Sequence, residues 1–132
     1  MMVSTDIPAG DSSTPVKTIP VVYVILPDWT MRTAVRAELR EMGIEALGMD
    51  SAEDAGRAMA SGQLPNVVVL EATEELLGDL RIQNLVHRFP AVMIASRTVK
   101  VPLPDTADVL YRPVRIADIV ARVTELLARD TA

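Results

Sequence analysis

Few side chains in this sequence have the chemistry that catalysis or metal binding requires. The 132 residues include no cysteine and one histidine, His87. This composition removes thiolate nucleophiles, disulfides and cysteine-based zinc sites, and a single imidazole makes no metal site. Two carboxylates, Asp28 and Glu71, closely follow apolar runs. Because Mg²⁺ can bind through one or two carboxylates together with a substrate phosphate, these two residues are the local candidates for that role.

Two further polar positions follow later apolar runs. Ser96 comes after residues 91–95, and Arg112 with Pro113 comes after residues 108–111. The segments after residues 19–26 and 66–70 lack the glycine-rich pattern that cradles phosphate groups. A nucleotide-type cofactor is therefore not expected, and we assign no cofactor.

Apolar runs alternate with segments of helical periodicity. The expected strands occupy residues 19–26, 44–49, 66–70, 91–95 and 108–111. The β-branched run at residues 19–26 is typical of a strand buried on both faces. Apolar residues recur at helical spacing within residues 31–42, 55–59, 82–89 and 116–127. Gly43 and Gly62 stand where helices should end, and Ser51 can cap the second helix. We expect Met42 on a buried face, and Glu74 and Glu75 in a solvated loop.

This alternation predicts an α/β fold. Strands separated by helices form right-handed βαβ units, and therefore a doubly wound parallel sheet that is covered on both faces. Ligands bind such sheets at the carboxyl ends of the strands, near the point where the strand order reverses. The candidate site accordingly comprises the residues that follow each strand: Leu26, Pro27, Asp28, Glu71, Ala95, Ser96, Arg112 and Pro113.

Length and composition fit a single domain. With 49% apolar and 23% charged residues, the chain has a globular composition. Residues 1–18 are rich in Ser, Thr, Asp, Gly and Pro and are interpreted as a flexible tail, and residues 19–129 as the domain. The net charge of −5 disfavours nucleic acid. The chain has neither an apolar stretch of about 20 residues nor a signal-peptide pattern, so we expect a cytoplasmic protein that does not engage a membrane.

Four stretches resemble the receiver domain of bacterial response regulators. Residues 26–44 (LPDWTMRTAVRAELREMGI) look like the first loop and helix of that family, and NVVVLEA looks like its third strand, which ends at the phosphoacceptor. Gly78 matches the usual glycine before the third helix, and YRPVRIADIVARV resembles the fifth strand, the Lys-Pro corner and the last helix. The resemblance implies a flavodoxin-like (βα)5 domain with strand order 2-1-3-4-5.

The chain departs from the family pattern at each position that carries the family's chemistry. The acidic pair that holds Mg²⁺ aligns with Leu26 and Pro27, and the phosphoacceptor aspartate aligns with Glu71. Asp28 lies one residue past the lost pair. The resemblance therefore implies that Mg²⁺-dependent phosphorylation is lost.

The phosphate-binding half of the family pattern is also altered. The hydroxyl position holds Ala95, with Ser96 one step late, and Arg112 replaces the lysine before Pro113. Arg112 can grip Glu71 in a bidentate pair and lock the domain in one signalling state. Alternatively, both residues are relics that pair or point to solvent. Because the family's Lys-Pro corner is commonly cis, we predict a cis Arg112–Pro113 peptide.

The connection between the fourth and fifth strands is the other departure. It is shorter than the family needs for its fourth helix, and Pro102 and Pro104 oppose a regular helix. We therefore expect helix 4 to be shortened or absent, with no helix of two turns in residues 97–107. In that case Val99, Val101 and Leu103 either form an apolar partner surface or fold onto the core. Trp29 is a second candidate for a partner surface, or packs against the first helix.

The sequence thus predicts a pseudo-receiver, a non-enzymatic signalling domain that docks to a partner protein, with a homodimer as a further possibility. Two alternatives remain open. One is an atypical receiver that is still phosphorylated at Glu71, and the other is a module on the same fold that binds a small ligand.

Overall fold

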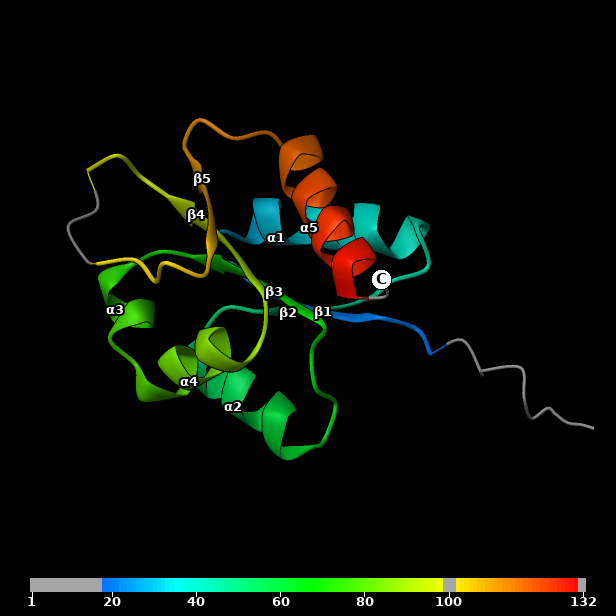
Figure 1. The fold of residues 1–132 in the computed structure, drawn as a ribbon, viewed down its shortest axis with the longest axis horizontal. Helices are drawn as coiled ribbons and strands as arrows, with labels where there is room; N and C mark the ends of the chain where they lie inside the picture. Colours follow the sequence, from blue (N-terminus) through cyan, green and yellow to red (C-terminus); the bar gives the residue numbers. More distant parts are fainter. Residues whose placement is uncertain (1–17, 99–101, 131–132) are drawn as a thin grey trace, which may run out of the picture.

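The computed structural model describes residues 18–98 and 102–130, and it forms one five-stranded parallel sheet with helices on both faces (Figure 1). The strands are β1 (Val21–Ile25), β2 (Glu45–Met49), β3 (Val67–Glu71), β4 (Ala91–Ala95) and β5 (Asp108–Tyr111). The helices are α1 (Trp29–Glu41), α2 (Ala52–Ala60), α3 (Glu74–Leu77), α4 (Leu80–Arg88) and α5 (Ile116–Asp130). The strand order is β2-β1-β3-β4-β5, which confirms the predicted doubly wound fold.

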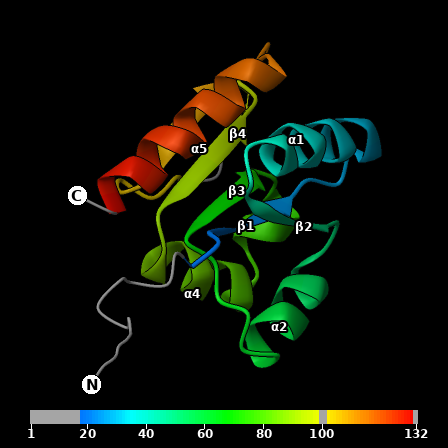
Figure 2. The same ribbon diagram turned by 90° about the vertical axis from the view of Figure 1, so that its right-hand side faces the viewer.

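Two apolar layers hold the sheet between its helices. Helices α1 and α5 cover one face, and α2, α3 and α4 cover the other (Figures 1 and 2). The first layer contains Val35 and Leu39 of α1 packed with Ile119 and Val123 of α5, all fully buried. The opposite layer is built by buried residues of the other three helices, among them Ala55, Leu76, Leu77, Ile82 and Leu85.

Burial along the strands follows their place in the sheet. The central strands β3 and β4 are buried at nearly every residue, which explains their unbroken apolar sequences. The edge strand β2 has the sequence EALGM and a mixed burial pattern, and β5 at the other edge has no fully buried residue. The first strand is shorter than predicted, since Ile19 is 64% exposed and β1 begins only after Pro20.

The predicted helix boundaries at Ser51, Gly43 and Gly62 are confirmed. Ser51 accepts a hydrogen bond from the Asp54 amide at 3.2 Å and caps α2. Gly43 and Gly62 have φ values of +81° and +88°, a backbone conformation that glycine adopts without strain, and each directly follows a helix end. Met42 was predicted to be buried but is 54% exposed, because it forms the C-cap where α1 leaves the sheet.

The β3–β4 connection corrects another prediction. Glu74 and Glu75 were placed in a loop, but they open the one-turn helix α3, whose N-cap Thr73 accepts a hydrogen bond from the Leu76 amide at 3.1 Å. The turn forms because it buries Leu76 and Leu77, and the two acids favour its N-terminus. Gly78 ends this turn and separates it from α4.

No helix connects β4 and β5 within the described residues. Residues 97–98 and 102–107 form turns and irregular chain, as predicted from the two prolines, and residues 99–101 lie outside the described part (Figure 1). Helix α4 belongs to the preceding connection, so the family's fourth helix has no counterpart among the residues that the structure places. The Arg112–Pro113 peptide is cis, as predicted.

Candidate functional site

The carboxyl end of β1 has no side chain that could hold a cation. Leu26 is fully buried in the layer beneath α1, and its amide donates to the Met49 carbonyl at 3.1 Å. Pro27 is exposed at the surface. Of the two residues that align with the family's acidic pair, Leu26 therefore packs in the core. Pro27 offers only a backbone carbonyl oxygen.

Asp28 caps α1. Its Oδ1 accepts hydrogen bonds from the amides of Thr30 at 2.9 Å and Met31 at 3.3 Å. The carboxylate is thus engaged with the helix N-terminus, where a negative charge is stabilised. Its Oδ1 therefore serves the helix cap rather than a cation.

Arg32 secures the same loop from the first turn of α1. Its Nη1 donates to the carbonyl of Leu26 at 2.7 Å and to that of Pro27 at 3.3 Å. A guanidinium therefore binds the backbone of both positions where the family holds its acidic pair. The fixed positive charge disfavours a divalent cation there.

Glu71 and Arg112 meet across the sheet. Glu71 ends β3, Arg112 follows β5, and Arg112 Nη2 donates to Glu71 Oε1 at 2.8 Å. The side chains are 22% and 35% exposed, so this ion pair is half-buried. One hydrogen bond joins them, rather than the bidentate pair considered from the sequence.

The position after β4 does not supply a hydroxyl to this pair. Ala95 is buried, and its carbonyl accepts from the Arg112 amide at 2.9 Å, which fixes the start of the Arg112 corner. Ser96 is exposed, and its Oγ lies 2.7 Å from the Thr98 hydroxyl in its own turn. The structure therefore brings Glu71 and Arg112 together, while Ser96 bonds within its own turn.

The residues at this edge do not fit the Mg²⁺ that the fold family implies. Mg²⁺ requires near-octahedral oxygen ligands, but Asp28 is used as a helix cap and Glu71 is paired with Arg112. Within the described residues, no three side chains of His, Cys, Asp or Glu form a potential metal site.

A cleft of 490 Å³ lies beside this edge, between the loops that follow β1, β2 and β3. Its lining includes the carboxylates of Asp50, Glu53, Glu75 and Asp79, and one cation, Arg81. Arg81 bonds both oxygens of Asp79, and this hydrogen bonding lowers the Asp79 pKa to about 2. An acidic cleft without glycine among its lining residues does not suit an anionic cofactor such as a nucleotide.

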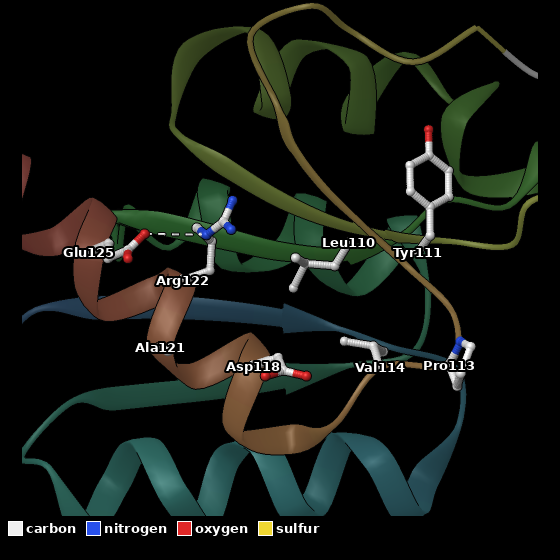
Figure 3. A pocket seen from close by; sticks show the side chains of 8 residues that line it. All are labelled: Leu110, Tyr111, Pro113, Val114, Asp118, Ala121, Arg122 and Glu125. Carbon is white, nitrogen blue, oxygen red and sulfur yellow. Dashed lines mark ion pairs between the residues drawn. The ribbon is translucent and has the colours of Figure 1, made fainter.

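A shallow groove of 280 Å³ runs between β5 and α5 (Figure 3). Leu110, Val114 and Ala121 supply apolar lining, and Tyr111 stands at the strand end with 43% exposure. Arg122 also lines the groove and forms ion pairs with Glu125 at 3.3 Å and with Asp108 at 3.6 Å. This groove was not found by sequence reasoning.

The residues proposed as partner surface differ in their surroundings. Trp29 is 67% exposed at the start of α1, so it does not pack against that helix as one interpretation held. Leu103 is half-buried and packs against the core layer on the α4 side. Val99 and Val101 lie outside the described residues. At Leu103, then, the connection is folded onto the core of its own domain.

Comparisons with known proteins agree with this architecture. No protein-family model matches the chain, and no curated protein matches its sequence. Solved structures do match. A receiver domain of a Francisella response regulator has a TM-score of 0.66 and 21% identity, covering 84% of this chain and 98% of that one. Receiver proteins from Burkholderia phymatum (TM-score 0.65, 20% identity, 83% and 95% covered) and Methanospirillum hungatei (0.68, 18%, 83% and 94%) are similar.

The chain has the fold of a receiver domain. At these identities the likeness concerns the fold, so the role of each site residue rests on the contacts described above. Two residues that shape the site were missed from the sequence, Arg32 and Thr73. Arg32 was detectable in principle, since a long side chain in a first helical turn points back toward the preceding loop.

Within the described residues of this receiver-like domain, no helix is both long enough and apolar enough to cross a membrane.

Proposed function

We propose that this receiver-like domain acts in signal transduction as a non-catalytic docking module, without Mg²⁺-dependent phosphorylation. The observation that carries the proposal is the half-buried Glu71–Arg112 ion pair. In sequence, these two residues align with the family's phosphoacceptor and its lysine. Arg112 engages Oε1 of Glu71, so this oxygen is not free to attack a phosphoryl donor while the pair is intact.

The surrounding groups support the same conclusion. Leu26 is buried and Asp28 caps a helix, so a phosphoryl donor would meet Glu71 without a metal ion to share its charge. Glutamate is also one methylene longer than aspartate, and a misplacement of about 1 Å can cost about 10²-fold in rate. The two effects multiply, and together they leave no efficient route to an acyl phosphate.

The ion pair has a structural role in this proposal. It ties the end of β3 to the corner after β5, two segments separated by β4 in the sheet. It therefore holds the carboxyl edge in a single arrangement that does not depend on phosphorylation. A carboxylate has one negative charge where a phosphoryl group has nearly two, so the arrangement need not be the one that phosphorylation induces in relatives.

We propose that a partner docks on the side of β5 that faces away from β4 and in the groove between β5 and α5. The backbone groups of Val109 and Tyr111 point away from β4, because Arg112, Leu110 and Asp108 face it. The proposed occupant is an extended segment of a partner protein. It pairs with β5 as an additional strand and places an apolar side chain against Leu110 and Val114. A second copy of the chain is the competing occupant.

The chemical part of the proposal is tested by thermal melting with Mg²⁺, with Mg²⁺ plus beryllium fluoride, and with acetyl phosphate. Any ligand that binds the folded state alone raises Tm, by about 2.7 kcal/mol of stability at 100 times its Kd. We expect no rise beyond that of a matched salt control, and no change in the fluorescence of Trp29. A rise that needs both Mg²⁺ and beryllium fluoride and disappears in Glu71→Gln would establish an atypical phosphorylated receiver instead.

The docking part is tested in cells that depend on the gene. We expect Tyr111→Ala to abolish the signalling phenotype and Glu71→Gln to retain most of it, with both variants folded by circular dichroism. If Glu71→Gln abolished the phenotype and Tyr111→Ala retained it, the function would depend on the chemistry of Glu71 rather than on docking at β5. Light scattering of the purified protein distinguishes the occupants, because a dimer that Tyr111→Ala disrupts would assign the groove to a second copy.

A further inference from the structure

The two edge strands of the sheet differ in whether a side chain covers their outward backbone groups. Strand β2 lies outermost at one edge and β5 at the other. An edge strand presents unpaired N–H and C=O groups, to which another strand can bond. In β2 the amide of Glu45 and the carbonyl of Met49 face β1, so the backbone groups of Ala46 and Gly48 point outward.

Arg36 reaches this outer edge from α1. Its Nε donates to the Ala46 carbonyl at 3.2 Å, which is one of the outward acceptors of β2. The aliphatic part of the side chain lies over Gly48, where an added Cβ would stand 2.6 Å from Arg36 Cδ. Glycine at this position therefore makes room for Arg36 to cross the strand.

Electrostatics do not favour this placement of Arg36. Arg32, Arg36 and Arg40 follow one another at four-residue spacing on α1, and like charges at this spacing destabilise a helix slightly. Burial, followed by repulsion from Arg40 and Arg32, lowers the Arg36 pKa, and Glu45 offsets part of this effect. No ion pair within the described residues involves any of the three arginines. The bond to Ala46 is thus the direct polar contact that holds Arg36 over the strand.

The other edge has no such cover. Within the residues that the structure describes, no side chain bonds the outward backbone groups of Val109 or Tyr111 on β5. The nearest feature is Arg97, whose guanidinium lies 5.2 Å from the centre of the Tyr111 ring rather than on the backbone.

We propose that Arg36 closes the β2 edge against a second copy of this chain. Two β2 strands related by a two-fold axis through Leu47 would place Ala46 of one opposite Gly48 of the other. Both residues point outward, so each pair could exchange two hydrogen bonds. The edge is therefore self-complementary, and Arg36 occupies the Ala46 acceptor that the pairing needs. This inference goes beyond the docking function, because it does not depend on what binds β5.

The test compares Arg36→Met with Arg40→Met by sedimentation velocity over a range of protein concentrations. Both changes remove one charge from the same helix, but only Arg36 contacts β2. We expect Arg36→Met to strengthen self-association at least tenfold over the wild type, and Arg40→Met to match the wild type. Equal association of the two variants, or of Arg36→Met and the wild type, would overturn the proposal.

A second pair of variants reaches the same edge by another route. Gly48→Ala should displace Arg36 through the 2.6 Å contact and also increase association, which keeps the test available if Arg36→Met folds poorly. The double variant Arg36→Met/Gly48→Pro removes an outward N–H without touching the bonds to β1, and proline is tolerated at edges. It should return to wild-type association. Association that survives this double change would show that β2 is not the contact.

Discussion

The Glu71–Arg112 ion pair makes a quantitative prediction about stability. We consider the single variants Glu71→Gln and Arg112→Met and the double variant that combines them. A double-mutant cycle isolates the pairwise term, because changes that each residue causes by itself cancel. The atoms Arg112 Nη2 and Glu71 Oε1 are 2.8 Å apart, so the cycle reports a direct contact.

The expected coupling follows from the burial of the pair. Unit charges about 4 Å apart attract by about 1 kcal/mol in water and about 4 kcal/mol at an effective dielectric constant near 20. With 22% and 35% of the side chains exposed, screening and the cost of ordering two long side chains remove much of this attraction. We expect a net coupling of about 1 kcal/mol, which corresponds to about 4 °C in Tm for a domain of this size.

The assay is urea unfolding followed by circular dichroism, with thermal melting as a second measure. The matched control is the cycle of Arg57→Met with Glu53→Gln, an i,i+4 pair on α2 whose side chains are 68% and 67% exposed. Its coupling should be about 0.3–0.5 kcal/mol and should fall in high salt. The Glu71–Arg112 coupling should be larger and less sensitive to salt.

Two results would refute this reasoning. A coupling below about 0.3 kcal/mol would mean that the pair is a solvated contact with no role in holding the carboxyl edge together. A double variant more stable than the wild type would mean that desolvation of the charges exceeds their attraction, as in some buried pairs. Either result would remove the structural role of the pair and leave it as a relic.

Three further predictions concern single residues. Replacing Arg81 by Met should raise the Asp79 pKa from about 2 toward its usual 3.8, because Arg81 is its main stabilising partner. Carboxyl chemical shifts measured against pH test this. In the wild type, the stability that the lowered pKa contributes should be present above pH about 4 and lost as pH falls toward 2. Asp28→Ala should destabilise the domain by about 1 kcal/mol through loss of the α1 cap, and Asp28→Asn by less, in the same urea assay. Leu39→Ala should cost about 2–5 kcal/mol, since Leu39 is fully buried between α1 and the sheet; a cost below about 1 kcal/mol would contradict the packing described.

The fold was predictable because its signals are redundant. The central strands β3 and β4 are apolar runs, and the four longer helices show apolar periodicity, so one weak signal does not change the architecture. Details failed where one residue decides the outcome. Met42 is apolar and in phase with its helix, but it falls at the helix end, where no sheet remains to cover it. The one-turn helix α3 was not predicted, because Glu74 and Glu75 were interpreted as part of a solvated loop. The structure shows that Thr73 caps this turn.

The candidate site was predictable in position but not in contacts. The rule that strand ends converge located Glu71 and Arg112 at one edge, and their pairing is what the structure adds. Sequence spacing does not specify whether Arg112 makes one hydrogen bond or two. For Arg32, the first helical turn indicates a contact with the preceding loop, but its acceptors are backbone carbonyls, which no residue type marks.

The missing helix and the altered site are connected through the last two strands. A helix between β4 and β5 would cover apolar surface that the shorter connection covers with Leu103 and Ala107, both packed against the core together with Val109 of β5. This covering is thinner, so every residue of β5 keeps some exposure and Tyr111 stands 43% exposed at its end. Arg112 follows directly, and its bond to Glu71 anchors the end of this lightly covered strand to the centre of the sheet. The ion pair that, in the proposed function, excludes phosphorylation would therefore also stabilise the edge strand on which the proposed docking depends.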